Sequence, residues 1–253
     1  LRFVADHENA ALVFLQGTRI IIARHGNTFA KDETPRRVGG RTDLDLVEEE
    51  RGRNVGRYLK AKGLIPALVF AAPLKRTVNT AKLAIEEMGG GMPLEIDDSF
   101  REVDYGPDEN KTDDEVMLRL GQVYAVKEGK NPAEMSEGAL TDVGRHVIDL
   151  WNEKAIVPDG WKVSPEDCIH AWMKFGEKVF KNFHGENIMV VSSNGVIRFA
   201  PYLTGDFNGF AGEHDIKVTT GGVCVFERED DEENWRCTEW NVKPKKYFES
   251  LPD

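Results

Sequence analysis

One pattern recurs three times along the chain and constrains the fold most: a short apolar run, a polar loop and then a helical segment. The apolar runs are rich in β-branched residues and lack polar alternation, which is typical of strands buried on both faces of a parallel sheet. They occupy residues 19–23, 67–71 and 187–191. Strands that alternate with helices in this way predict an α/β fold with three layers, α/β/α, around a mostly parallel sheet.

The helical segments have recognisable starts and stops. A partly apolar stripe over 47–62 precedes Gly63, and Pro73 opens a helix over about 74–88 that ends before three consecutive glycines. A third helical run begins after 192–195 and ends near Leu203. Within the tail at 222–241, two further strands are expected around an acidic turn.

We expect one domain over residues 18–253, preceded by an N-terminal extension at 1–17. A chain of 253 residues can bury a full core as a single unit. Between 107 and 186 the pattern changes to polar helical stretches interrupted by glycine and proline. This segment is predicted to be a helical insertion over the active-site end of the sheet, and its tryptophans either fill a core or line a specificity pocket.

Charge and cysteine content limit the binding partners and the cellular location that we expect. The net charge of −11 argues against a general nucleic-acid or anionic-membrane surface, so an anionic substrate needs a local cationic pocket. Cys168, Cys224 and Cys237 show no metal-ligand spacing and are expected to be free thiols. No run approaches the ~20 apolar residues that cross a bilayer. We therefore expect a cytoplasmic location, although residues before Leu1 can have been removed.

The candidate chemistry lies where the strands give way to loops, because ligands of open α/β sheets bind beyond the carboxyl ends of the strands. The first such junction reads Arg24-His25-Gly26-Asn27-Thr28. It combines a cation, a potential nucleophile and a flexible glycine. An imidazole nitrogen can accept a phosphoryl group and pass it to water, which divides one difficult displacement into two easier ones.

Residues 24–28 resemble the RHG signature of the phosphoglycerate-mutase-like, or histidine phosphatase, superfamily. They follow a predicted strand, as the signature does in that family. The run 39–46, which includes Thr42, is similar to the segment that skirts the family's phosphate pocket. The run 72–81 resembles the S-x-L-x-R-x-x-x-T-A element, with alanine in place of serine. The resemblance covers about residues 18–107 and 187–226, and it implies His25 as nucleophile and Arg24, Asn27 and Arg76 as phosphate ligands.

Two carboxylates compete for the proton-transfer role. Residues 100–106 resemble the family's L-x-E-x-x-x-G element, which makes Glu102 the general acid and later the base for water. Asp104 is the alternative. An alkoxide leaving group needs a proton at neutral pH, so one such acid is required whatever the family.

The third junction departs from the family. Its strand should end in a second histidine, but residues 191–198 place Ser193 or Asn194 there, depending on the alignment of the loop. Either side chain keeps a hydrogen bond to phosphate and loses the positive charge. His214 is a weak candidate to compensate. Arg198 either faces the pocket or only ties a helix to the sheet.

The leading functional hypothesis is a phosphomonoester hydrolase that forms a phosphohistidine on a small phosphorylated metabolite. The alternatives are a weakened or inactive phosphate-binding pseudo-phosphatase and, less favoured, a phosphoglycerate-type mutase, because residues 100–106 lack the mutases' L-N-E-R-H-Y-G run. No metal or cofactor is expected, since no metal-ligand pattern accompanies His25 and the phosphohistidine route needs no divalent ion. A homodimer stays open.

Overall fold

The computed structural model describes residues 3–4, 13–14 and 17–252, so most of the expected N-terminal extension at 1–17 lies outside the described residues. The described part contains a central sheet of six strands in the order β5-β4-β6-β3-β7-β8. Parallel pairing joins β5, β4, β6 and β3, whereas β7 runs antiparallel to both its neighbours. The predicted mostly parallel sheet is confirmed. The strands are β3 (Thr18–Arg24), β4 (Leu68–Ala71), β5 (Leu94–Ile96), β6 (Asn187–Ser192), β7 (Val223–Arg228) and β8 (Arg236–Val242).

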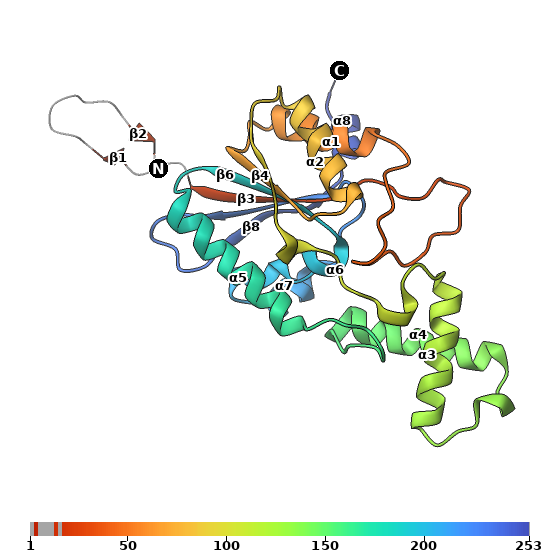
Figure 1. Ribbon diagram of the computed structural model, residues 1–253. Helices are drawn as coiled ribbons and strands as arrows, with labels where there is room; N and C mark the ends of the chain where they lie inside the picture. Colours follow the sequence, from red (N-terminus) through yellow and green to blue (C-terminus); the bar gives the residue numbers. More distant parts are fainter. Residues whose placement is uncertain (1–2, 5–12, 15–16, 253) are drawn as a thin grey trace.

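Two apolar clusters, one on each face of the sheet, explain why the middle residues of the central runs are all apolar. Alternate residues of β3 point to opposite faces, so Ile20 and Ile22 join one cluster and Ile21 joins the other. The helices α1 (Glu50–Ala61) and α2 (Lys75–Glu87) cover the face of Ile21, and α5 (Pro165–Asn182) runs along the opposite face. The three predicted layers are therefore present (Figure 1).

A pair of helices extends beyond the end of the sheet, as Figure 1 shows. They are α3 (Asp113–Lys127) and α4 (Glu137–Lys154). Glycines allow their close approach, because a Cβ on Gly121 would lie 1.8 Å from the carbonyl oxygen of Leu140. The sequence analysis grouped α5 with this helical segment, but α5 lies along the sheet and buries Trp172 and Phe175 in the core.

The remaining elements are short. The helical run expected to end near Leu203 is divided into α6 (Asn194–Ile197) and a 3₁₀ helix (Ala200–Thr204), because Pro201 cannot donate the hydrogen bond that a continuous helix needs. The sequence analysis did not identify β5, α7 (Phe207–Glu213) or α8 (Pro244–Glu249). Further short elements are β1 (Phe3–Val4), β2 (Val13–Phe14) and the 3₁₀ helices Asp98–Phe100, Gly106–Asp108 and Pro132–Glu134.

Among the described residues, no helix is both long enough and apolar enough to cross a membrane.

Candidate active site

The first and third predicted junctions lie side by side at the carboxyl ends of β3 and β6. These strands pair in parallel with Arg24 opposite Ser192, so the next residues along each strand are His25 and Ser193. The backbone N–H of His25 donates to the carbonyl of Ser192 over 3.2 Å. In the described structure, Ser193 thus occupies the position next to His25 on the adjacent strand.

The imidazole of His25 is held in one orientation and is only 6% exposed. Its Nδ1 lies 2.7 Å from the carbonyl oxygen of Gly26, which can only accept, so Nδ1 carries the proton and donates. Burial lowers the pKa of His25 well below its usual range, and the charges of Arg24 and Arg76 lower it further. The ring is therefore neutral near pH 7, and its Nε2 carries a lone pair.

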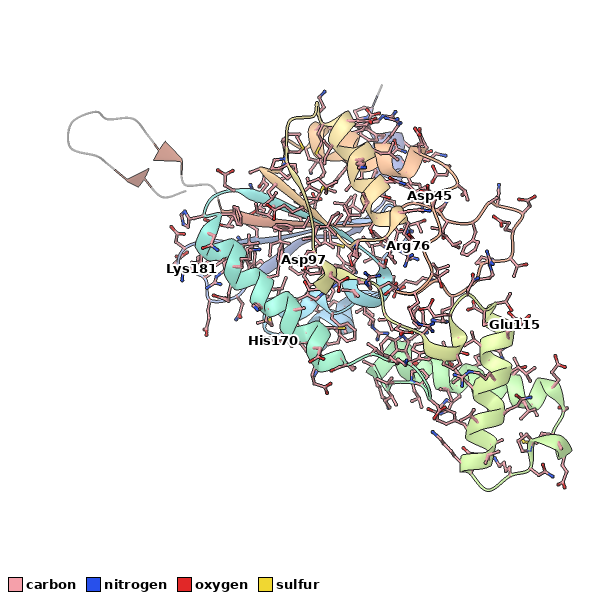
Figure 2. All side chains as sticks on the ribbon, viewed as in Figure 1. Asp45, Arg76, Asp97, Glu115, His170 and Lys181 are labelled. Carbon is pink, nitrogen blue, oxygen red and sulfur yellow. The ribbon has the colours of Figure 1, made fainter. Side chains whose placement is uncertain are left out.

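Two buried guanidinium groups flank this imidazole. Arg76 comes from the first turn of α2 and donates through Nη1 to the carbonyl of Thr42 over 2.7 Å, and Arg24 donates through Nη1 to the carbonyl of Val218 over 2.6 Å. Figure 2 places Arg76 where α2 faces the end of the sheet. For both arginines the buried Nε–H has no hydrogen-bond partner in the part of the chain that the structure describes. Free guanidinium donors of this kind fit the oxygens of a phosphate group.

The carboxyl group of Glu102 is buried at the same place, with 8% of the residue exposed. Its Oε1 accepts from the N–H of Val103 over 2.9 Å, and its Oε2 accepts from the N–H of Gly195 over 3.3 Å. Burial raises the pKa of Glu102, although these hydrogen bonds and the nearby arginines act in the opposite direction. The carboxyl group can therefore hold a proton at a higher pH than an ordinary glutamate.

Asp104, the alternative acid, has a different environment. Its Oδ1 accepts from Nε of Arg41 over 2.9 Å and from the N–H of Gly106 over 2.8 Å. Partial burial acts to raise its pKa, but these partners outweigh burial and lower it. Asp104 is thus an ionised carboxylate in an ion pair, which suits it poorly to donate a proton.

The substituted third junction keeps a buried hydroxyl close to His25. Ser193 is 1% exposed, and its Oγ has no hydrogen-bond partner among residues 17–252. The side chain of the following residue is engaged, because Oδ1 of Asn194 accepts from the N–H of Val218 over 2.8 Å. The Oδ1 of Asn194 thereby helps to hold the loop that also binds Arg24, while its Nδ2 group remains a donor at the cavity that Asn194 lines. Ser193 and Asn194 thus each keep a donor at this junction.

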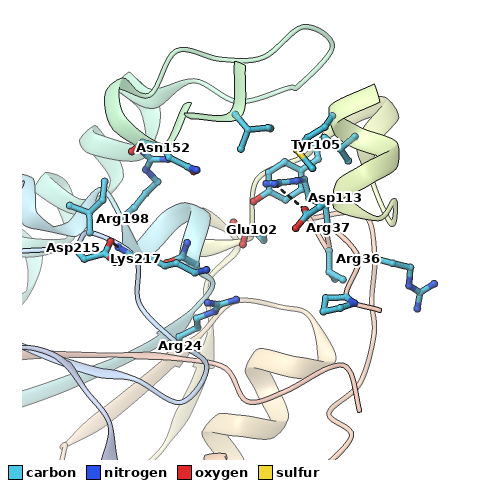
Figure 3. A pocket seen from close by; sticks show the side chains of 17 residues that line it. Arg24, Arg36, Arg37, Glu102, Tyr105, Asp113, Asn152, Arg198, Asp215 and Lys217 are labelled. Carbon is cyan, nitrogen blue, oxygen red and sulfur yellow. Dashed lines mark hydrogen bonds and ion pairs between the residues drawn. The ribbon is translucent and has the colours of Figure 1, made fainter. Parts of the chain in front are cut away.

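A cavity of about 480 Å³ opens above these residues, between the end of the sheet and the α3–α4 pair. Figure 3 shows Arg24 below, Glu102 near the centre, Arg198 and Lys217 on one side and Arg37 on the other. His25 and Arg76 do not line the cavity; both are buried beside Arg24. The lining is mostly polar and comprises Arg24, Pro35, Arg36, Arg37, Val38, Glu102, Tyr105, Asp113, Val116, Met117, Ile148, Asn152, Asn194, Arg198, Asp215, Ile216 and Lys217.

The other predicted site residues are divided between the cavity and its surroundings. Arg198 does both things that were considered for it, since it lines the cavity and its Nη2 donates to the carbonyls of Trp151 and Asn152 over 2.8 Å each. Asn27 does not reach the cavity wall, and its Oδ1 accepts from Oγ1 of Thr220. His214 is exposed and stacked on Phe210, so the structure does not bring it to the site.

Thr42 acts on the site through its backbone, which accepts from Arg76, while its hydroxyl donates to Glu109 over 2.5 Å. Glu109 also accepts from the N–H groups of Gly39 and Tyr105, and it thereby fixes the loop under Arg76. Sequence reasoning missed Glu109, Arg37 and Lys217. The acidic residue had no motif to mark it, and the adjacent Arg36 and Arg37 before two glycines were the available signal for a cationic wall.

The arrangement can bind a phosphate-like dianion beside a neutral imidazole and can move a proton at Glu102. Within the described part of the chain, no group of three or more His, Cys, Asp or Glu side chains is placed to hold a metal ion.

Comparisons with known proteins identify the family of the chain. The model of the histidine phosphatase superfamily (branch 1) matches residues 20–153. A 2,3-bisphosphoglycerate-dependent phosphoglycerate mutase from Methylobacterium sp. (strain 4-46) is 33% identical over 41% of this chain and 50% of its own length, and one from Methylorubrum extorquens (strain PA1) is 30% identical over 52% and 64%. The chain thus spans about half to two thirds of the length of these relatives.

Solved structures share the fold. A phosphoglycerate mutase from Bacillus anthracis str. Sterne has a TM-score of 0.64 at 19% identity, over 91% of this chain and 98% of that one. A mycobacterial glucosyl-3-phosphoglycerate phosphatase in complex with inorganic phosphate has a TM-score of 0.61 at 17% identity, over 90% and 99%. At these identities the likeness concerns the fold.

Proposed function

Because the chain belongs to the histidine phosphatase superfamily (branch 1), we propose that it is a phosphomonoester hydrolase that transfers the phosphoryl group of a small metabolite first to His25 and then to water. One observation carries the proposal. A neutral imidazole, fixed by the Gly26 carbonyl, and a carboxyl group with a raised pKa, that of Glu102, both feel the charges of the same two guanidinium groups, whose Nε–H donors are free in the described part of the chain.

In the first half-reaction, Nε2 of His25 attacks phosphorus. The Nε2–P bond forms while the bond from phosphorus to the alcohol oxygen breaks, and Glu102 gives its proton to the departing oxygen. The free Nε–H groups of Arg24 and Arg76 donate to the phosphoryl oxygens, where negative charge accumulates in the transition state. The hydrogen bond from Nδ1 to Gly26 stabilises the ring as it becomes positively charged.

In the second half-reaction, Glu102 is a carboxylate and takes a proton from water. The water oxygen bonds to phosphorus, and the P–Nε2 bond breaks. His25 returns to its neutral form, Glu102 is protonated again, and phosphate leaves. The raised pKa of Glu102 suits both steps, since a group that gives and then takes a proton works best with a pKa close to the working pH.

The third junction determines how fast this enzyme is. We assign to the free hydroxyl of Ser193 the hydrogen bond that a second histidine would donate to the phosphoryl group. A hydroxyl brings no positive charge. Loss of a whole preorganised donor at a developing charge typically costs about 10²–10³ in rate. Because Ser193 keeps the hydrogen bond and lacks only the charge, we expect turnover slower than in a site with two histidines, by no more than this factor.

The same junction favours a second candidate, a pseudo-phosphatase that binds phosphorylated ligands without turnover. Its support is that neither Ser193 nor Asn194 supplies the positive charge of a second histidine, and that Oδ1 of Asn194 is already bound to the N–H of Val218. A mutase is the third candidate and rests on the names of the relatives. Residues 100–106 lack the mutase run, which favours water over a second hydroxyl as acceptor.

The three free thiols at Cys168, Cys224 and Cys237 support a cytoplasmic location.

The test compares wild type with His25→Ala on p-nitrophenyl phosphate and a panel of sugar, nucleotide and amino-acid phosphates, without added metal. Phosphate release by the wild type alone is expected. Release that survives in His25→Ala would refute the phosphohistidine route. Vanadate binding without turnover in the wild type would favour the pseudo-phosphatase.

A further inference from the structure

The cavity carries a second group of cations on two facing sides. Arg198 and Lys217 line one side and Arg37 lines the other, in addition to Arg24, which serves the nucleophile (Figure 3). One transferred phosphoryl group needs the donors of Arg24 and Arg76 and leaves these three side chains without a role. We call Arg37, Arg198 and Lys217 the outer cations.

Arg198 is the most deeply buried of the outer cations, with 5% of the residue exposed. Its guanidinium lies 4.6 Å from the ring centre of Trp151, and Nη2 is fixed by two carbonyl groups. Its buried Nε–H has no hydrogen-bond partner among the residues the structure describes. A buried donor without a partner is destabilising, and an anionic ligand in the cavity that Arg198 lines would satisfy it.

Arg37 repeats this arrangement on the opposite wall. Its guanidinium lies 5.1 Å from the ring centres of both Tyr105 and Trp161, and its Nε–H likewise has no partner within residues 17–252. Contact with ring faces holds a guanidinium in place while its N–H groups, which lie in its own plane, stay free to bind an anion. The nearest acid is Asp113, 3.5 Å away and 76% exposed in its side chain, which is too solvated to neutralise Arg37 fully.

The charge balance of the cavity lining is positive. The outer cations, Arg24 and Arg36 bring five positive charges, and the lining holds three carboxyl groups, those of Glu102, Asp113 and Asp215. An excess of two positive charges in a cavity of a chain with a net charge of −11 is a local feature that favours an anion.

We propose that the substrate carries a second anionic group, a carboxylate or a phosphate, on the part that leaves as the alcohol, and that Arg37, Arg198 and Lys217 bind this group. The inference rests on the proposed function, because it takes His25 as the place of the transferred phosphoryl group. The alcohol then extends past Glu102 into the cavity, between the two rigid arginines. Lys217 is exposed at the cavity wall and completes the binding of the second anion.

Three ligands that differ only at their far end test the proposal: propanediol monophosphate, the matching phosphooxypropanoate and propanediol bisphosphate. Binding is measured by calorimetry on His25→Ala, which cannot turn them over. The two ligands with a second anionic group, called doubly anionic below, or one of them, are expected to bind about ten- to a hundredfold more tightly than the ligand with a neutral hydroxyl at its far end. This factor is typical of one added charge-assisted hydrogen bond. The carboxylate and phosphate arms identify which anion fits.

The same series is repeated with Arg37→Met and Lys217→Met added to the His25→Ala background, because Arg198→Met would also free two carbonyls of α4 and could unfold the helix end. Each added change is expected to reduce the preference for doubly anionic ligands severalfold or more. Arg145→Met is the matched control, since it removes one exposed cation from α4 at a position outside the cavity. It should leave the preference intact.

The outcomes separate the two proposals. Equal binding of all three ligands would overturn the second-anion inference, whether or not the wild type is a hydrolase. So would a preference that Arg145→Met reduces as much as the cavity variants do. A preference that the cavity variants remove supports the inference even if the wild type hydrolyses none of the three, in which case the proposed function fails and the binding site stands.

Discussion

Replacing Glu102 with glutamine is expected to affect esters according to the basicity of their leaving groups. An alkyl alcohol needs the proton of Glu102, and removal of a positioned general acid typically costs about 10²–10⁴ in rate. A p-nitrophenolate leaves without a proton, so its first turnover should fall by no more than a fewfold. The glutamine keeps the shape of the side chain. Its single amide oxygen can replace only one of the two carboxyl oxygens that accept from the N–H groups of Val103 and Gly195.

The assay is a rapid-mixing measurement of the first turnover with p-nitrophenyl phosphate and with an alkyl phosphate. Because Glu102 also activates water, the variant should release one burst of p-nitrophenol per active site and then stall. The matched control is Asp104→Asn, at the other carboxylate of the same segment, which pairs with Arg41. We expect it to change both first turnovers by no more than a fewfold. An equal loss on both esters in Glu102→Gln, or the leaving-group pattern in Asp104→Asn instead, would refute the assignment of the acid.

Three further predictions follow from the same contacts. The neutral imidazole attacks and its pKa is lowered, so kcat/KM for an alkyl phosphate, which reports the free enzyme and the first half-reaction, should persist as the pH falls through about 6.5. Loss of the proton from Glu102, whose pKa is raised, sets the alkaline limb of that profile. An acid limb at the ordinary histidine value in the pH–kcat/KM profile would contradict this. Arg76→Lys keeps the charge but loses the fork of donors, and vanadate inhibition should weaken by about ten- to a hundredfold. Arg119→Met leaves the buried carboxylate of Asp108, 1% exposed in its side chain, without its charged partner. The free energy of unfolding measured in urea should fall by about 2–3 kcal/mol. An unchanged free energy would show that the hydrogen bond from the indole of Trp161 suffices for Asp108.

The sheet could be predicted because its central strands are buried on both faces and the middle residues of each strand are all apolar. Ile20, Ile21 and Ile22 are all fully buried, and such a run has few other places in a folded chain. The short edge strand β5 could not be found this way, since Leu94, Glu95 and Ile96 are half-buried or exposed and carry little signal. The position of α5 also escaped prediction, because an amphipathic pattern shows that a helix has an apolar face but not which surface it covers.

The residues of the candidate site also differ in how far the sequence predicts them. Residues directly after a buried strand, such as His25 and Ser193, could be identified because the topology of a parallel sheet brings those ends together. Arg37 and Lys217 reach the cavity from loops far apart in the sequence, so only the folded chain shows that they line the same cavity. Their placement depends on tertiary contacts such as the rings of Tyr105 and Trp161, which no local pattern encodes.

The central claim is that His25 carries the phosphoryl group between substrate and water. The most direct measurement mixes the Glu102→Gln variant with a ³²P-labelled phosphomonoester, quenches in alkali and locates the label by peptide mapping and mass spectrometry. The account predicts close to one alkali-stable, acid-labile phosphoryl group per active site on His25, and none in a His25→Ala, Glu102→Gln double variant. Label on another residue, or wild-type turnover with no trapped phosphoenzyme in the variant that should accumulate it, would contradict the account.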